Sequence, residues 1–188
     1  MKKYYYIAAG AFILYLAFRK KSKSVESELN STEMNTPEEY IDEVYKALTA
    51  IVDRWGEEKA KGIERMYRLE TAHFKSEQFK KGFTAGMEAF SDKFPYKWSS
   101  LQAFIEEEAT DLSPSDFSTF TMREGGTGKI KTFIKFPSIP DAFNFLAFVL
   151  NKRKWNYGSW YSTKPESQQR YNERLKTIKP RIVNDIIS

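Results

Sequence analysis

The start of the chain holds the feature that most restricts how it can fold. Tyr4–Phe18 is an uncharged, almost wholly apolar run of fifteen residues, with Lys2-Lys3 before it and Arg19-Lys20-Lys21 after it. At about 1.5 Å per residue, a helix of this length spans roughly 22 Å, against a hydrocarbon core of roughly 30 Å. Lysines that reach the interface, and the tyrosines that begin the run, make up much of the difference. We therefore expect residues 1–24 to be an uncleaved, single-pass membrane anchor.

A cleaved secretory signal is the alternative interpretation of this segment, because its charged start and short apolar run fit both. No small-x-small cleavage site follows Phe18, and the basic residues there are typical of a stop-transfer flank. The larger positive cluster follows the run, which favours a cytoplasmic C-terminal domain, but the lysines before it leave the orientation open. The expected location is the cell envelope or the internal membrane of a virus particle, with Tyr4–Phe18 in the lipid bilayer and other envelope or virion proteins as neighbours.

Composition excludes several kinds of chemistry. The 188 residues include no cysteine and one histidine, His73, so disulfides, thiol nucleophiles and zinc sites of the usual ligands are excluded. We expect no cofactor and no metal. The net charge is +5, but residues 1–24 alone carry six bases and no acid. From Lys152 onward nine bases face three acids, a surplus suited to phosphate or an acidic polymer, yet no nucleic-acid-binding motif accompanies it. We expect no nucleic-acid partner.

Residue patterns divide the remainder into a flexible tether, 25–36, and a folded domain, 37–188. The tether is rich in Ser, Glu, Asn and Thr and has no apolar periodicity. Three capping patterns each place proline near a helix start, at Thr36-Pro37, Ser138-Ile139-Pro140 and Thr163-Lys164-Pro165.

Hydrophobic spacing then predicts the elements of the folded domain. Helices are expected over 37–54 (broken by Gly56), 57–74, 83–90, 101–109 and 139–150, with a last helix from about 165 that is interrupted near Pro180. Two stretches rich in Thr, Phe and Ile, 117–123 and 129–136, predict a hairpin around a glycine-rich loop. The expected fold class is α+β, mainly helical, with one small β-hairpin lobe.

Glu70 interrupts the apolar face of the helix predicted over 57–74. It follows Ile63 by seven positions, which places it within about 20° of the same face, beside Met66, Tyr67 and Phe74. A carboxylate in such surroundings favours its protonated form, so we predict that its pKa is raised, as a general acid near neutral pH requires. The alternatives are a solvated residue near a helix end and a structural ion pair.

The segment around Glu70 resembles the catalytic segment of the glucosaminidase and soluble lytic transglycosylase families, which belong to the lysozyme-like superfamily. The matching residues are Glu70-Thr71-Ala72-His73-Phe74-Lys75-Ser76, Phe79 and Gly86-Met87. Lys131–Leu150 is similar to the glucosaminidase stretch in which an aromatic-rich strand leads through Ser into a helix, and Gly158–Tyr171 is similar to that family's end. The resemblance covers about Ile63–Ile178, in order, and Thr71 stands where serine is usual.

The resemblance implies a lysozyme-like domain that cleaves the β-1,4 bonds between the amino sugars of peptidoglycan. Glu70 would protonate the glycosidic oxygen. Glu124, at the hairpin tip, is the candidate for the second carboxylate that glycosidases ordinarily use; the alternative is a solvated turn acid. Lytic transglycosylases need one glutamate only, because the substrate's own 6-hydroxyl closes the ring, and the sequence leaves hydrolysis and transglycosylation open.

Four further residues are candidates for substrate binding. His73 follows Glu70 by one turn, Trp160 and Tyr161 belong to an aromatic cluster, and Tyr171 lies in the first turns of the last predicted helix. Aromatic faces suit the apolar faces of sugars, but each of these side chains has an ordinary structural alternative in the core or at the surface.

Three functional hypotheses follow. The first is a membrane-anchored enzyme that cleaves peptidoglycan, and a membrane-containing phage particle is one setting for it. The second is a lysozyme-like module without activity that binds glycan. The third is a structural membrane protein of a virion or cell envelope.

Overall fold

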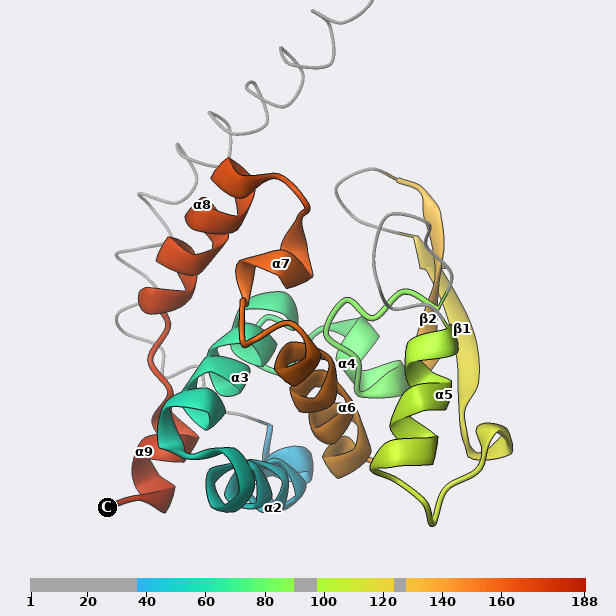
Figure 1. Cartoon of the computed structure of the whole chain (residues 1–188), viewed down its shortest axis with the longest axis horizontal. Coiled ribbons are helices and arrows are strands. Elements are labelled where there is room, and N and C mark those ends of the chain that lie inside the picture. Colours follow the sequence, from blue (N-terminus) through green and yellow to red (C-terminus); the bar gives the residue numbers. More distant parts are fainter. Residues whose placement is uncertain (1–36, 90–97, 124–127) are drawn as a thin grey trace, which may run out of the picture. The chain divides into compact units, whose positions relative to one another are not determined.

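The computed structural model describes residues 37–89, 98–123 and 128–188 (Figure 1). These residues belong to one compact unit, Thr36–Ser188. Within the described ranges, no helix combines the length and the apolar character that crossing a bilayer requires. The predicted anchor (1–24), the tether (25–36) and Glu124 lie outside the described residues.

Helices α2 (Glu38–Trp55) and α3 (Glu57–Glu70) form the predicted pair at the start of the folded domain. Gly56 separates them, and its φ of 87° is a conformation that glycine adopts at little cost. Val44, Leu48 and Ile51 of α2 are fully buried. α2 packs against both α3 and α6. The break predicted at Gly56 is confirmed.

Helix α6 (Ile139–Lys152) is the centre of the core. It lies between α3 and α5 (Trp98–Glu107) in Figure 1, and most of its residues are buried. The predicted cap at its start is confirmed, because the Ser138 hydroxyl accepts a hydrogen bond from Asp141 N at 3.2 Å. Phe143 stacks on Tyr67 of α3 with 3.8 Å between ring centroids, which ties the two helices together.

The predicted hairpin is confirmed as strands β1 (Ser118–Arg123) and β2 (Ile130–Lys135), paired antiparallel with Phe120 opposite Phe133. A short 3₁₀ turn, Pro114–Asp116, precedes β1. An extended segment before α5 pairs with the other edge of β2: Ala89 N donates to Thr132 O at 2.8 Å and Ile134 N to Met87 O at 3.0 Å. The hairpin is thereby attached to the segment that contains Gly86.

The helix predicted over 83–90 is wrong. The helix is α4 (Glu77–Gly82), which begins earlier because the Ser76 hydroxyl accepts a hydrogen bond from Phe79 N at 3.2 Å. It ends at Phe83, whose φ is 56°. Met87–Ala89 then pair with β2, and this long-range pairing overrides the local helical pattern.

The C-terminal part consists of α7 (Gly158–Tyr161), α8 (Pro165–Lys176) and α9 (Arg181–Ile186). The predicted last helix and its interruption near Pro180 are confirmed. The predicted cap differs: Lys164, not Thr163, is the capping residue of α8, and no side chain forms a cap hydrogen bond there. The described chain is therefore mainly helical with one two-stranded antiparallel sheet, as the sequence predicts.

Candidate active site

Glu70 is the last residue of α3, and a buried threonine fixes the chain directly after it. Thr71 N donates to Tyr67 O at 2.9 Å, and the Thr71 hydroxyl donates to the same oxygen and accepts from Phe74 N at 2.9 Å. Thr71 is fully buried. The hydroxyl forms these contacts, and serine, the residue usual at this position of the resembling families, carries the same group.

The helix predicted to continue to Phe74 stops at Glu70. Ala72, His73 and Phe74 all lie in the left-handed region, with φ of 48°, 59° and 68°. For residues with a side chain this costs roughly 1–2 kcal/mol each. Two bonds that close the turn, from His73 N to Arg68 O at 2.8 Å and from Ser76 N to Thr71 O at 2.9 Å, hold the chain in this conformation. The spacing of Phe74 from the apolar residues before it fits a helix, but in the structure a left-handed turn, not a helix, places Phe74 in the core.

Three elements meet at the Glu70 carboxyl. A Cβ added at Gly86, where φ is 77°, would lie 3.9 Å from Glu70 Oε2 and 4.0 Å from Trp160 Nε1. Trp160 of α7 is buried, and its indole N–H donates to Ala85 O at 3.2 Å. The structure thus brings together Glu70, the Gly86 segment and Trp160, which the sequence separates by up to ninety residues.

The surroundings of Glu70 raise the pKa of its carboxyl. Burial raises the pKa of the Glu70 carboxyl above its usual range, against a hydrogen bond from Tyr171 and the positive charge of Arg174, both of which lower it. The side chain is half-buried, so solvent reaches part of it. The upward direction predicted from the apolar stripe is confirmed. A protonated carboxyl at this point can donate a proton to a group that reaches it.

Tyr171 connects Glu70 to an exposed aromatic surface. Tyr171 of α8 is buried, and its ring stacks on Tyr161 of α7 with 5.0 Å between centroids and 12° between planes. Tyr161 is 54% exposed, which is unusual for a large aromatic side chain in this molecule. Of the four binding candidates, Tyr161 has an exposed ring, whereas Trp160 and Tyr171 are buried and His73 is half-buried.

His73 lies in the left-handed turn, two residues after Thr71 and three after Glu70. Its ring is half-buried, and Nδ1 has no hydrogen-bond partner. Burial, with the charges of Arg68, Lys75 and Arg181, lowers the pKa of His73 to about 4. His73 is therefore neutral at physiological pH and cannot supply a positive charge to a ligand.

Glu64 lies six residues before Glu70 on the same helix, but its surroundings differ from those of Glu70. It is fully buried; Oε1 accepts from Arg68 Nε at 2.7 Å and from Ile182 N at 3.0 Å, and Oε2 accepts from Val183 N at 2.8 Å. The sequence alone does not single out this residue. The i, i+4 spacing of Glu64 and Arg68 is the one signal available, and it does not reveal the bonds to α9. With its acceptors occupied, Glu64 has a structural role.

Two other residues near the site were also missed. Arg174 of α8 acts on Glu70 by its charge and lies one turn after Tyr171, a spacing that could have indicated a shared face. Glu88, two residues after Gly86, pairs with Lys131 of β2 at 2.6 Å. The predicted second acid, Glu124, is not among the described residues, so its role beside Glu70 stays a prediction.

In the described ranges, no group of three or more acidic or histidine side chains is arranged to hold a metal ion. No family model matches the sequence, and neither the curated proteins nor the solved structures contain a match. The resemblance to glucosaminidases and lytic transglycosylases therefore stays a prediction from the sequence.

Proposed function

We propose that this chain is a membrane-anchored enzyme that cleaves the β-1,4 glycosidic bonds of peptidoglycan, with Glu70 as general acid. The observation that carries the proposal is the state of Glu70: a half-buried carboxyl whose burial raises its pKa, at the end of a helix and beside the Gly86 segment. A general acid that works near neutral pH needs such surroundings.

Each group around Glu70 has a role in this proposal. The protonated carboxyl donates its proton to the glycosidic oxygen as the bond to the anomeric carbon breaks, which leaves Glu70 as a carboxylate. Tyr171 and Arg174 stabilise that carboxylate, because both favour the charged form. Attack by water then gives a reducing end, and attack by the sugar's own 6-hydroxyl gives an anhydro-sugar. Tyr161 offers a ring face on which a sugar can stack.

The fold class is compatible with a lysozyme-like domain, which is part of the proposal. The acid ends one helix, a small hairpin is attached to the segment beside it, and α7 and α8 bring the aromatic residues to the other side. The anchor over Tyr4–Phe18 and the tether over 25–36 would hold this domain at a membrane, in a cell envelope or in a phage particle that contains one.

The test is the activity of purified full-length protein, in a non-ionic detergent, on isolated peptidoglycan. Glu70→Gln keeps the shape of the side chain but removes the proton donor, and we expect activity to fall by about 10²–10⁴-fold. Glu166→Gln, which changes an exposed acid at the start of α8, is the matched control and retains activity. If the wild-type protein binds peptidoglycan but releases neither reducing ends nor anhydro-sugars, the glycan-binding or structural alternative replaces the enzyme.

A further inference from the structure

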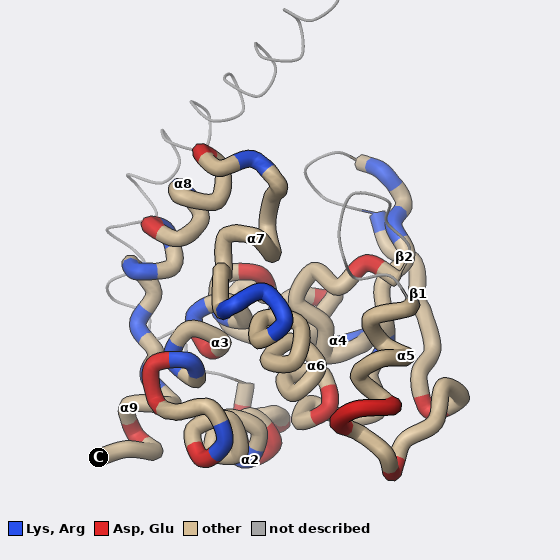
Figure 2. The backbone as a smooth tube through the Cα atoms, viewed as in Figure 1, with Lys and Arg blue, Asp and Glu red and all other residues tan. Residues whose placement is uncertain are grey.

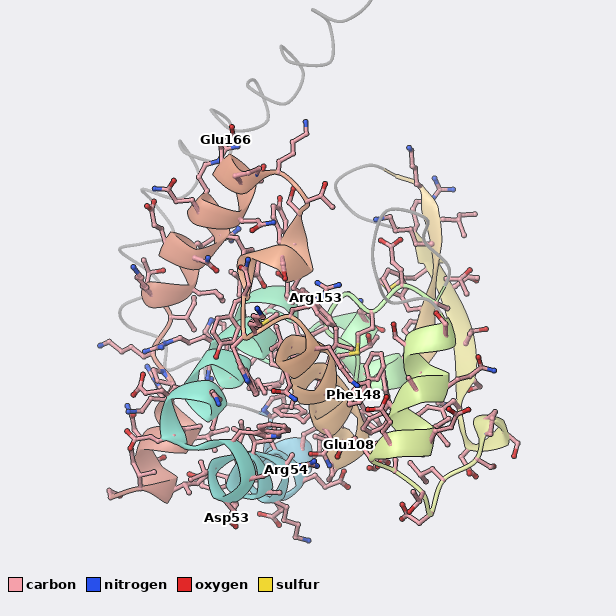
Figure 3. The ribbon with its side chains drawn as sticks, viewed as in Figure 1. Asp53, Arg54, Glu108, Phe148, Arg153 and Glu166 are labelled. Carbon is pink, nitrogen blue, oxygen red and sulfur yellow. The ribbon has the colours of Figure 1, made fainter. Side chains whose placement is uncertain are left out.

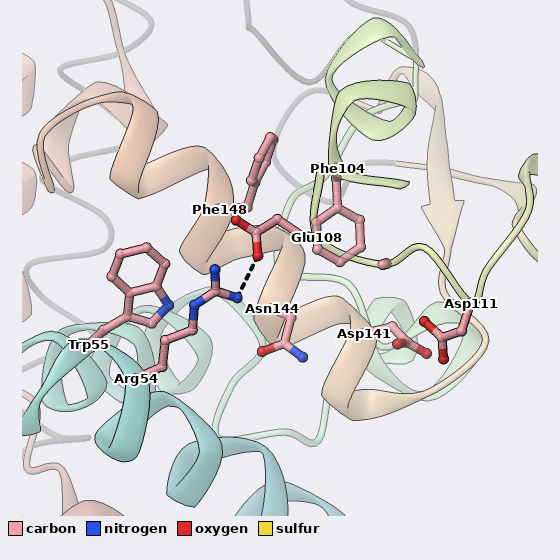
Figure 4. Close-up of a pocket in the computed structure, with 9 residues that line it drawn as sticks. Arg54, Trp55, Phe104, Glu108, Asp111, Asp141, Asn144 and Phe148 are labelled. Carbon is pink, nitrogen blue, oxygen red and sulfur yellow. Dashed lines mark ion pairs between the residues drawn. The ribbon is translucent and has the colours of Figure 1, made fainter. Parts of the chain in front are cut away.

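A cavity of about 180 Å³ lies where the end of α2 meets α5 and α6, and it shares no residue with the Glu70 site (Figure 4). Its aromatic lining comes from all three helices: Trp55 of α2, Phe104 of α5 and Phe148 of α6. Aromatic faces attract organic cations through the ring quadrupole.

The charged lining of this cavity is strongly acidic. Glu108, Asp111 and Asp141 face a single base, Arg54. Figure 2 shows the same asymmetry at larger scale, with acidic residues concentrated at the end of α5 and in the turn that follows it. In the described part of the chain the acids are not arranged to hold a metal ion. An organic cation is the ligand class that suits both the acids and the rings.

One end of the cavity already binds a cation from the chain itself. The Arg54 guanidinium lies 4.8 Å from the centroid of the Trp55 ring, and Arg54 Nη1 is 2.5 Å from Glu108 Oε2 (Figures 3 and 4). The lining of this cavity thus already holds one positive group, the Arg54 guanidinium, between a carboxylate and an aromatic face.

The other end of the cavity has two further acids, Asp111 and Asp141, and neither forms an ion pair with a lysine or arginine of the described chain. Asp111 and Asp141 lie together there in Figure 4, with Asn144 between them and the ion pair. Burial and the neighbouring charge of Asp111 raise the pKa of Asp141, against a hydrogen bond that its carboxylate accepts from the Ser138 hydroxyl, which lowers it. A cation placed between the two aspartates would relieve this repulsion.

Size limits what can enter. The cavity volume of about 180 Å³ is below the roughly 300–1,000 Å³ of a typical small-molecule pocket, so the cavity suits a small ligand. We propose that this cavity binds a primary ammonium group on a short alkyl chain, such as the end of a lysine side chain, with Asp111 and Asp141 as its anionic partners. This site does not depend on the function proposed for Glu70.

The probe is 1,5-diaminopentane, titrated against full-length protein in detergent and followed by ligand-detected NMR, with 1,5-pentanediol as the uncharged analogue. We expect the diamine to bind and the diol not to bind. The double change Asp111→Asn with Asp141→Asn weakens diamine binding by about tenfold or more, because both charged partners are lost.

Asp53→Asn is the matched control, since Asp53 is an exposed acid on α2 that does not line the cavity (Figure 3). It should leave the dissociation constant within about twofold, as expected for a screened surface charge. Equal binding of the diol, absence of diamine binding, or an equal loss in Asp53→Asn would each overturn the proposal. A thermal unfolding curve for each variant shows that the fold is retained.

Discussion

Glu70 and Glu64 are six residues apart on one helix, yet the structure uses them in opposite ways. Glu64 is dry and accepts hydrogen bonds from Arg68 and from two backbone amides of α9, which stabilise its charge. Glu70 is half-buried, and its burial outweighs the effects of Tyr171 and Arg174 on its pKa. A buried, fully paired carboxylate has a structural role, whereas a partly solvated one that favours its proton can act as an acid.

The first prediction concerns the stability of Glu70→Gln. Because burial raises the pKa of Glu70 in the folded state, the wild-type protein loses stability as the pH rises through that pKa. The glutamine variant has no charge to bury, so its free energy of unfolding should exceed that of the wild type at pH 8. The difference should close as the pH falls below 4.5, where the acid is protonated in both states. Denaturant unfolding at both pH values measures this; a variant that is less stable at pH 8 would contradict it.

A second prediction concerns His73, whose pKa is lowered to about 4 from 6.5. Between pH 6.5 and about 4, His73 binds a proton in the unfolded chain but not in the folded chain. The free energy of unfolding therefore keeps its full value, as far as His73 affects it, above pH 6.5 and falls as the pH drops towards 4. His73→Asn removes this dependence, and asparagine tolerates the left-handed backbone at this position. We expect the wild type to lose about 2 kcal/mol relative to the variant between pH 7.5 and 4, less than the full shift implies because the ring is partly solvated. Parallel pH dependences of the two proteins would refute this.

The sequence alone predicts the surroundings of Glu70 on its own helix, but not the residues of α7 and α8 that lie near it. Helical periodicity alone places Glu70 on an apolar face and predicts the direction of its pKa shift. Tyr171 and Arg174 act on it from α8, and Trp160 of α7 lies near the same Gly86 segment, through contacts between distant parts of the chain. Such contacts depend on how helices pack, which a single sequence does not encode in a local pattern.

At the scale of elements, the sequence predicts where most helices start, but it predicts the structure of the segments beside Glu70 less well. Ser138 and the prolines mark starts because their effect is local. The wrong predictions are the extension of α3 to Phe74 and the helix over 83–90. Both lie beside Glu70, where left-handed residues and pairing with β2 replace the local preference. Departures from local rules are concentrated at functional or strained sites.

A third prediction is that Glu64 holds α9 in place. Glu64→Gln leaves Arg68 buried without its counter-ion, and loss of one partner of a buried pair costs about 3–5 kcal/mol. Chemical denaturation should show this loss. Glu58→Gln, on the same helix with a side chain that is 82% exposed, is the control and should change stability by no more than about 0.5 kcal/mol. A small effect of Glu64→Gln would mean that α9 is held by its apolar residues alone.

At the scale of the whole molecule, composition and pattern predict the fold class correctly: mainly helical, with one hairpin. They also predict helices where α2, α3, α5, α6 and α8 lie, with an interruption before α9, but they misplace α4 and do not predict α7. They do not predict the cavity between α2, α5 and α6, because its residues are separated by up to ninety-four positions and follow no motif. The membrane anchor stays a prediction of the sequence.

The most direct test of the account is the product analysis of peptidoglycan treated with wild-type protein, Glu70→Gln and Glu166→Gln at equal concentration. If Glu70 is the general acid, we expect soluble fragments with reducing or anhydro ends from the wild type and from Glu166→Gln. We expect the rate of their release to fall by about 10²–10⁴-fold in Glu70→Gln. Equal release by Glu70→Gln, with its fold intact, would contradict the account.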